Sequence, residues 1–383
     1  RLYIWIWGNV LKQDCTVSLH QKRCRLLLLP PRGLCLPLTA KFSPRFAEWY
    51  ATTIYVWVSK LGNFISSWFP FSVGEWVVYG LAAAFVTGIA VYTIRMLRYK
   101  AGRTRRTMAC FLHLCCVASV LYFLFVVNCG INYYRYPFSE VSGLGVRASS
   151  AEELIGLCEE LALKASSLRL EVREDASGVM ASSFGSHYEQ AQAARDCYDR
   201  LSEQYPTLQA GYGPPKPVLW SRGMSYLQIT GIFFPFTFEA NVNVDVPAYS
   251  IPSTMCHELN HLRGYMREDE ANFIAYLACM LSDSVDFRYS GTMLAYIHAS
   301  NALYEVDQEA FAQVYALLGE GVKRDLAAHN AYWRQFETPI AQAADSVNGA
   351  YLAANGQVDG VQSYGRMVDL LLAEYRQRHG LSY

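Results

Sequence analysis

The sequence lacks net charge and has little charge of either sign. Its 33 basic residues balance 33 acidic residues, and charged residues fill only 17% of the 383 positions. Proteins that bind the phosphates of a nucleic acid carry an excess of basic residues, which this composition does not supply. We therefore expect no nucleic-acid partner.

Closely spaced cysteine pairs are also missing. Of the 11 cysteines, seven lie in or near the apolar N-terminal third of the chain. The other four, Cys158, Cys197, Cys256 and Cys279, form no CxxC pair. This spacing disfavours a cysteine-based zinc site and a disulfide scaffold. An isolated Cys158–Cys197 bridge is the one pairing that stays open.

Two long stretches near the N-terminus carry no charged side chain. Hydrophobic residues make up 52% of the chain, and the excess lies in its first third. Residues 76–94 have no charge over 19 positions, and residues 108–127 have none over 20 apart from the titratable His113. A helix of that length covers about 30 Å, the thickness of a bilayer's hydrocarbon core. We predict two membrane-spanning helices; a pair of buried core helices is the alternative.

The loop between these stretches, residues 95–107, indicates the orientation. It contains six basic residues and no acidic one. By the positive-inside rule, such a loop lies on the cytoplasmic side of the membrane. Both outer ends of the hairpin, and everything after residue 129, then lie outside the cytoplasm. We expect a multi-pass protein of the cytoplasmic membrane, with the lipid bilayer as a partner.

The segments before the two predicted spans are less regular. Residues 1–39 contain apolar stretches, but Pro30, Pro31 and Arg32 interrupt the second, and we expect neither a clean span nor a signal peptide. The number of spans, two or three, stays open. Residues 46–69 are aromatic and amphipathic, which predicts interfacial helices on the outer membrane surface.

Composition divides the chain into an uncertain N-terminal segment (1–39), a membrane anchor (40–129) and a globular domain (130–383). In the globular domain, alternating or β-branched segments predict short strands at 217–221, 225–231 and 236–245. Apolar spacing with a helical period predicts helices at 253–263, 268–283, 291–304, 308–318, 321–353 with a break near Pro339, and 362–378. We expect a mostly helical α+β domain with a small antiparallel sheet, joined to a helical membrane hairpin.

The sequence HELNH at positions 257–261 combines residue types that bind and use a metal ion. His257 and His261 are four positions apart, so on a helix they lie on the same face. Two imidazoles so placed can bind a Zn²⁺ ion, and Glu258, about 100° around the helix axis, can take a proton from a water that the ion activates. The pattern predicts zinc ligands at His257 and His261 and a catalytic base at Glu258. The alternative is an exposed helix face with coincidental histidines.

A third ligand is expected from the acidic residues that open the next helix. A third histidine at the metzincin spacing is excluded, because Arg267 stands at that position. The E-x-x-A-N pattern at 268–272 is similar to that of the glutamate zincins, whose third ligand is a glutamate on a following helix. This resemblance implies Glu268 as the ligand and Asn272 as the hydrogen-bond partner of a zinc-bound imidazole. Glu270 is the alternative ligand.

Other residues complete the predicted site. Residues 229–245 resemble the edge strand with which such peptidases pair an extended substrate backbone. An ordinary structural strand is the alternative. Glu239, Asn241 and Asn243 alternate along this strand and share one face, which we expect to lie toward the cleft. The oxyanion of a tetrahedral intermediate also needs a hydrogen-bond donor, for which Tyr364 and Arg366 are the candidates.

Five segments across the chain carry a family resemblance. They are HELNHLRGYMREDEANFIAYLAC (257–279), PFTFEANVN (235–243), FRYSG (287–291), GINYYRYPF (130–138) and SYGRMVDLLL (363–372). Together they resemble a family of bacterial membrane proteins called domain of unknown function 3810 (DUF3810), over about residues 45–378. The resemblance implies a bacterial membrane protein with a zincin-like, zinc-dependent peptidase domain. Members usually begin with a cleaner first span than residues 1–39 provide.

These observations predict a membrane-anchored zinc metallopeptidase that hydrolyses a peptide or protein substrate on the extracytoplasmic side. A catalytically silent zinc-binding scaffold protein is the alternative. The intact Glu258 argues against that alternative, because this residue is dispensable for binding metal but not for hydrolysis. A transporter or channel would need acidic, basic or histidine side chains within its spans, and His113 is the only one there.

Overall fold

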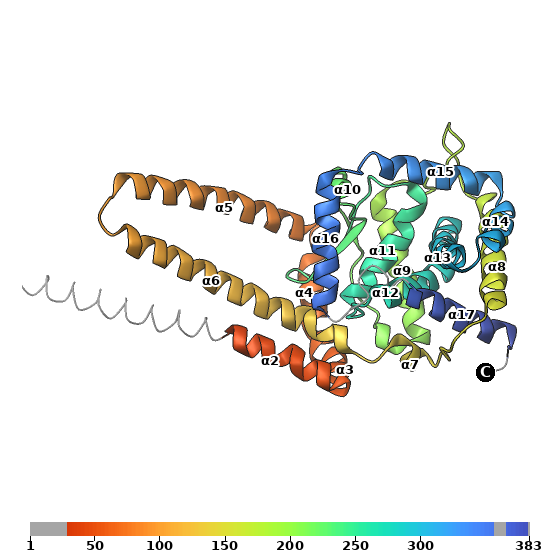
Figure 1. Ribbon diagram of the computed structural model, residues 1–383, viewed down its shortest axis with the longest axis horizontal. Helices are drawn as coiled ribbons and strands as arrows, with labels where there is room; N and C mark the ends of the chain where they lie inside the picture. Colours follow the sequence, from red (N-terminus) through yellow and green to blue (C-terminus); the bar gives the residue numbers. More distant parts are fainter. Residues whose placement is uncertain (1–28, 356–364, 382–383) are drawn as a thin grey trace, which may run out of the picture.

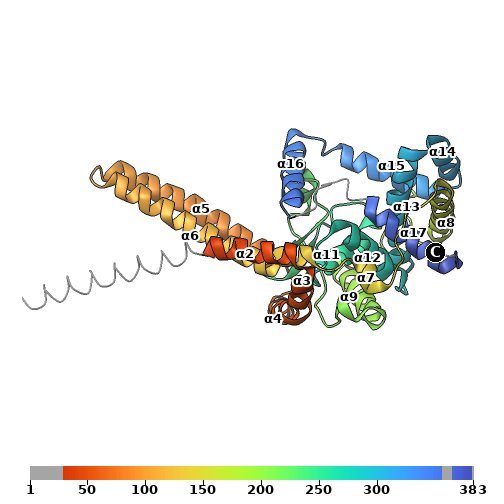
Figure 2. The ribbon, with the colours of Figure 1, turned by 60° about the horizontal axis from the view of Figure 1, so that its bottom comes forward.

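The computed structural model describes residues 29–355 and 365–381. Two long helices, α5 (Val73–Arg98) and α6 (Arg103–Asn128), project from one side of a mostly helical body (Figures 1 and 2). Both are long and apolar enough to cross a membrane. They contain the two stretches predicted to be spans, and the basic loop forms the far end of the hairpin.

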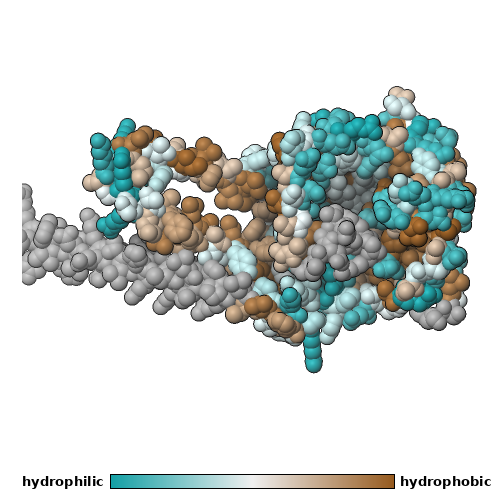
Figure 3. Space-filling view, viewed as in Figure 1, coloured by the Kyte–Doolittle hydropathy of each residue, from teal (hydrophilic) through white to brown (hydrophobic). Residues whose placement is uncertain are grey.

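The apolar side chains of these two helices are turned outward. No part of the apolar stretch of α5 is buried, and only 17% of that of α6 is. Their surface is hydrophobic along its length, and hydrophilic side chains gather at the far end of the hairpin (Figure 3). The alternative of two buried core helices is therefore wrong. Apolar surface of this extent is typical of contact with a partner or a bilayer.

Shorter helices precede α5. They are α2 (Leu29–Phe42), α3 (Pro44–Tyr50), the π-helical turn η1 (Ala51–Tyr55) and α4 (Val56–Ser66). Helix α2 packs along α6 (Figure 1). Pro30 and Pro31 lie within this helix, so they do not interrupt the segment as the sequence predicted. The predictions for residues 1–28 lie outside the described residues.

The segment from α3 to α4, predicted to be interfacial, also packs against the body. Tyr55 is fully buried, and its hydroxyl donates to the Leu262 carbonyl at 3.2 Å. Arg135 donates two hydrogen bonds, of 3.0 and 2.9 Å, to the Glu48 carboxylate. The face of this segment that is turned away from the body exposes large apolar side chains, including Trp57. This segment therefore joins the membrane-length helices to the body rather than lying apart from it.

The centre of the body consists of α11 (Ile251–Leu262), α12 (Glu268–Met280) and α13 (Val285–Val306), which pack on one another (Figure 1). The helices around them are α8 (Ala151–Arg169), α9 (His187–Gln204), α14 (Gln308–Ala316), α15 (Glu320–Arg334), α16 (Pro339–Ala354) and α17 (Gly365–His379). Short helices are η2 (Gly130–Tyr134), α7 (Phe138–Ser142), η3 (Pro206–Leu208), α10 (Ser221–Tyr226) and η4 (Ala248–Ser250).

Helices from α11 onward follow the predicted order, with α15 and α16 separated at the predicted break. Cys158 and Cys197 are free thiols, so the bridge left open by the sequence is not formed.

The sheet has three short strands, β1 (Lys216–Pro217), β2 (Gly231–Phe234) and β3 (Glu239–Val242), in the order β1-β3-β2. The predicted antiparallel sheet is wrong in one pairing: β2 runs antiparallel to β3, but β1 runs parallel to it. Parallel strands need a long connection between them, and the chain between β1 and β3, which contains both α10 and β2, is long enough to provide it. The strand predicted at 225–231 is not formed, because α10 continues into it and Gln228 turns the chain at φ 55°.

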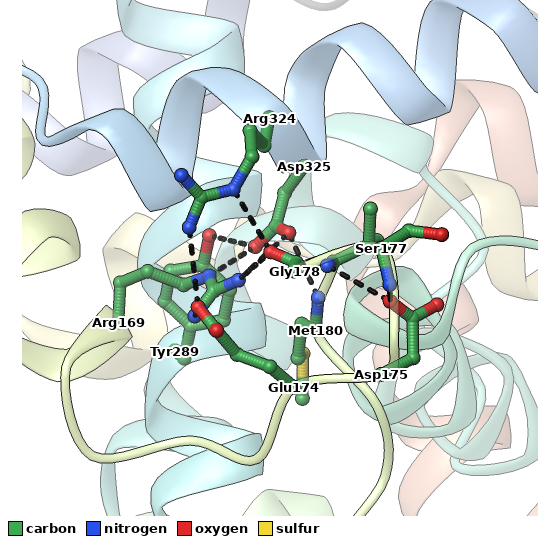
Figure 4. A network of polar contacts seen from close by, with 10 residues as sticks. Arg169, Glu174, Asp175, Ser177, Gly178, Met180, Tyr289, Arg324 and Asp325 are labelled. Atoms are coloured by element: carbon green, nitrogen blue, oxygen red, sulfur yellow. Dashed lines mark hydrogen bonds and ion pairs between the residues drawn. The ribbon is translucent and has the colours of Figure 1, made fainter.

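A buried carboxylate fastens the loop between α8 and α9 to the body (Figure 4). Asp325, on α15, is fully buried and accepts hydrogen bonds from Arg169 Nε at 2.7 Å and from the Tyr289 hydroxyl at 2.6 Å. It also accepts the Met180 N–H at 2.9 Å. Because these donors come from α8, α13 and the loop, one side chain holds four segments together.

Candidate metal centre

Helix α11 begins and ends at residues that suit those positions. Pro252 lies in its first turn. The helix ends in a Schellman turn, in which Gly264 (φ 83°) donates to the His261 carbonyl at 2.9 Å and Tyr265 donates to the Asn260 carbonyl at 3.3 Å. The turn brings the Tyr265 carbonyl beside the last histidine, where it accepts from Nδ1 of His261 at 2.8 Å. The glycine at the predicted helix end therefore helps to position a potential ligand.

Three potential ligand side chains meet between α11 and α12. Nε2 of His261 lies 2.9 Å from Nε2 of His257, and the Glu268 carboxylate oxygens lie 3.1 Å from the latter atom and 3.6 Å from the former. A tetrahedral metal ion with bonds of about 2.0–2.1 Å separates its ligand atoms by about 3.3 Å. The group therefore fits a metal ion. The side chains are 10–24% exposed, so the cluster is accessible from one side.

Each histidine is oriented through its other ring nitrogen. Asn272 Oδ1 lies 2.8 Å from Nδ1 of His257, and the Tyr265 carbonyl lies at the same distance from Nδ1 of His261. Because a carbonyl oxygen only accepts, both Nδ1 atoms donate, and both Nε2 atoms can offer a lone pair to a cation. Asn272 lies one helical turn after Glu268, where the sequence places it.

Glu258 lies beside this cluster and against strand β2. It is only 4% exposed. Gly231 packs so closely against it that a Cβ on this glycine would lie 2.5 Å from Oε1. The Phe233 N–H donates to the carboxylate. The other oxygen, Oε2, is buried without a hydrogen-bond partner among the described residues. That oxygen is available to a group that enters the site.

Burial and neighbouring charges set the protonation of the three potential ligands and of Glu258 when no cation is bound. Burial alone would lower the pKa of His257, but the hydrogen bond and charge of Glu268 raise it to about 9. Burial lowers the pKa of His261 to about 4. Burial raises the pKa of Glu258 to about 8, whereas the two histidines outweigh burial at Glu268 and lower its pKa to about 2. A buried carboxyl whose pKa lies near neutrality is suited to proton transfer.

Among the described residues, strand β2 forms one edge of the sheet, and it lies beside Glu258. It lies at one end of the strand order. The Asn243 N–H donates to the Thr230 carbonyl, so the backbone groups of residue 230 and of every second residue after it face β3. Because bonding groups alternate along an antiparallel strand, the backbone groups of Gly231 and Phe233 point away from β3. The Phe233 N–H is already bonded to Glu258. The Gly231 N–H and the carbonyls of both residues lie along the edge with which an extended peptide can pair.

Glu270, the alternative ligand, does not join the cluster. Its carboxylate accepts the Phe138 N–H at 2.7 Å and pairs with Arg267 at 2.7 Å. It points away from Glu268 because two positions on a helix are separated by about 200°. Of the two glutamates, the structure brings Glu268 to the histidines and uses the other to join α12 to α7.

The predicted polar face of β3 is not turned toward the site, so that prediction is wrong. Glu239 is buried and pairs with Lys216 at 2.6 Å. It also accepts the N–H groups of Val73 and Gly74 at 3.0 and 2.7 Å. Asn241 donates to the carbonyl of Ile232 in the neighbouring strand at 3.3 Å. Glu239 instead satisfies the first N–H groups of α5, which a helix cannot satisfy internally.

The predicted oxyanion donors are not placed at the site. Tyr364 lies outside the described residues, and Arg366 lies in the first turn of α17, where only the backbone is described. A pair of tyrosines near Glu268 was not predicted from the sequence. The Tyr133 and Tyr351 hydroxyls lie 2.9 Å apart. Burial, together with neighbouring groups that include Glu268, raises the pKa of both. They come from η2 and α16, too far apart in the chain for any spacing to link them.

Comparison with known proteins gives one match. A family model described as "Protein of unknown function (DUF3810)" matches residues 50–372. The matched range contains both membrane-length helices, strand β2 and the complete His–His–Glu cluster. No curated protein and no solved structure matches the chain.

Proposed function

The chain belongs to the DUF3810 family, and we propose that it is a membrane-anchored, zinc-dependent metallopeptidase of the glutamate-zincin type. The observation that carries the proposal is the position of Glu258. A buried carboxylate with an unpaired oxygen destabilises a fold by about 1–3 kcal/mol or more, so stability does not account for it. Beside a group that fits a metal ion, such a carboxylate has a use in catalysis.

Zinc is the ion that this ligand set favours. Two imidazole nitrogens and one carboxylate, with a fourth position open, are typical of catalytic zinc sites. When bound by His257, His261 and Glu268, the ion would supply Lewis acidity to a substrate carbonyl and to a water. The hydrogen bonds of Asn272 and of the Tyr265 carbonyl would hold the two imidazoles in the tautomer that binds it.

Glu258 would act as the general base and then as the general acid. Its carboxylate would take a proton from the attacking water and deliver it to the leaving amine nitrogen of the peptide. The Phe233 N–H and the contact with Gly231 hold this carboxylate at the edge of β2. An extended substrate paired with that edge would therefore pass directly over the base.

We also propose that the body lies on the extracytoplasmic side of a bacterial cytoplasmic membrane. The two membrane-length helices and the basic residues at the far end of their hairpin support this orientation. A reporter fused after Lys100 is expected to behave as cytoplasmic, and one fused after Ser139 as extracytoplasmic. The reverse pattern would place the body in the cytoplasm and overturn the orientation.

A catalytically silent metal-binding scaffold is the second candidate. It is favoured only by the accessibility of the His–His–Glu group, which any metal-binding role would require. It leaves the unpaired Glu258 oxygen without a use. The two candidates differ in chemistry rather than in metal content.

The test is to purify the full chain in detergent and measure bound metals and hydrolysis of a mixed peptide library. About one zinc ion per chain is expected, together with cleavage that a chelator abolishes and added zinc restores. Stoichiometric zinc without cleavage of any peptide would favour the silent scaffold. Absence of zinc after loading would overturn both candidates.

A further inference from the structure

Strand β2 joins the candidate active site to the ends of the membrane-length helices. At its first residue, Gly231 touches Glu258. At its last residue, Phe234 touches the first turn of α5, where a Cβ on Gly74 would lie 2.9 Å from the phenylalanine ring. Three steps of about 3.3 Å separate the two ends of the strand, so the base lies only about 10 Å from the start of α5.

The turn that follows β2 is held by both long helices. Asn128, the last residue of α6, donates through Nδ2 to the Pro235 carbonyl at 2.9 Å. Glu239, just after the turn, accepts the first N–H groups of α5. The bonds involve buried side chains on both sides of the turn. The strand therefore cannot move away from the helix ends without breaking buried hydrogen bonds.

Exposed aromatic side chains surround this turn. Phe236 packs on Phe234 with ring centroids 5.3 Å apart, and Phe71 packs on Trp76 at 6.3 Å. Three of these four side chains, Phe236, Phe71 and Trp76, are 36%, 39% and 54% exposed. Aromatic residues gather in this way at the boundary between the hydrocarbon core and water. With the proposed membrane anchoring, their position at the start of α5 corresponds to the outer bilayer surface, at the level of the turn.

From this arrangement we infer that the substrates are polypeptides anchored in the same membrane and cleaved within a few residues of its outer surface. The inference rests on the proposed peptidase function. A substrate strand paired with the outer edge of β2 lies along the line from Gly231 to Phe234, which leads to the bilayer surface. Only about three residues fit between the base and that surface.

The same distance disfavours long soluble substrates. When a peptide is bound along β2, its membrane-side portion must either end within about three residues of the cleaved bond or enter the bilayer. A folded domain on that side of the cleaved bond would collide with lipid. A membrane-anchored chain meets neither obstacle, because its anchor already occupies the bilayer beside α5.

The test uses the full chain in phosphatidylcholine vesicles with one cleavable sequence in every substrate. The sequence is attached to a diacyl lipid through spacers of about 2 to 20 residues, in one series at its amino end and in another at its carboxyl end. In at least one series, the rate should be highest at a spacer of about 3–6 residues. It should fall about tenfold at the longest spacer, because the effective concentration falls roughly as the −3/2 power of length. The Glu258→Gln variant shows which cleavage comes from this site.

The inference and the proposed function fail in different ways. Cleavage of the unanchored peptide in solution at a rate equal to that of every anchored one, with no spacer optimum in either series, would overturn the inference and leave the peptidase intact. No cleavage of any anchored or unanchored peptide by zinc-loaded protein would overturn the proposed function and the inference with it.

Discussion

Gly231 and Glu258 are in direct contact across the boundary between β2 and α11. A Cβ on the glycine would lie 2.5 Å from Oε1 and 2.6 Å from Cγ of the glutamate. Carbon atoms do not approach one another that closely, so only glycine leaves the carboxylate room to lie against the strand. The edge strand and the proposed base therefore depend on each other's positions.

The first prediction follows from this contact. Gly231→Ala should push the Glu258 side chain away from its position and lower kcat by about 10²-fold, since a displacement of about 1 Å has effects of that size. Bound zinc should be unchanged, because the three atoms nearest to a Cβ at residue 231 all belong to Glu258, which is not a proposed ligand. Gly349→Ala is the matched control, because a Cβ there meets nothing within 4 Å. Full activity of Gly231→Ala would remove the contact from the mechanism.

The second prediction separates the two glutamates of α12. Glu268→Gln should weaken zinc binding by an order of magnitude or more, because it removes a charged ligand oxygen. Glu270→Gln should keep the zinc but lower the free energy of unfolding by about 1–3 kcal/mol, because Arg267 loses its charged partner. Competition with a zinc-sensitive dye and urea unfolding measure the two quantities. The reverse pattern would assign the ligand to Glu270.

The third prediction concerns pH. Zinc needs a neutral His257, whose pKa is raised to about 9 when no cation is bound, so binding at lower pH displaces a proton. The apparent affinity should therefore rise about tenfold per pH unit up to about pH 9. His261, with a pKa lowered to about 4, is already neutral and adds no slope. The measurement is best made in Glu258→Gln, which removes the second titrating carboxyl. A flat profile from pH 6 to 9 would contradict the protonation described for the cluster.

How much of this molecule can be predicted from its sequence depends on the range of the interactions. Local rules predicted the helices from α11 onward, the break before Pro339 and the helix end at Gly264, because caps and apolar spacing act within a few residues. The close spacing of His257, His261 and Glu268 also follows from a short motif and the turn after it. The match to the DUF3810 family confirms the predicted family.

Features set by long-range packing could not be predicted. The polar face of β3 was expected at the cleft, but Glu239 satisfies the first turn of α5, 165 residues earlier in the chain. The meeting of Tyr133 with Tyr351 depends on how α16 folds back across the body. Nothing in the spacing of the sequence indicates that the turn after β2 is held by Asn128. Such contacts are fixed by tertiary packing rather than by local preference.

The fourth prediction tests the network that holds the loop between α8 and α9. Asp325→Ala should lower the free energy of unfolding by about 3–5 kcal/mol, because it leaves the buried Arg169 charge without its main partner. Glu174→Ala removes another partner of the same arginine, but this carboxylate is 44% exposed, so a loss of at most about 1 kcal/mol is expected. Urea unfolding of the two variants measures the difference. Equal losses would show that Asp325 is not the centre of the network.

Glu258→Gln tests most directly whether this glutamate is the base of a zinc-dependent peptidase. The amide is nearly the same size and can still accept the Phe233 N–H, but it cannot take a proton from water. Zinc content and kcat should be measured on the same preparations of wild type and variant, with a peptide that wild type cleaves. We expect about one zinc per chain in both and a fall in kcat of at least about 10²-fold in the variant. A zinc-loaded variant that cleaves at the wild-type rate would contradict the account.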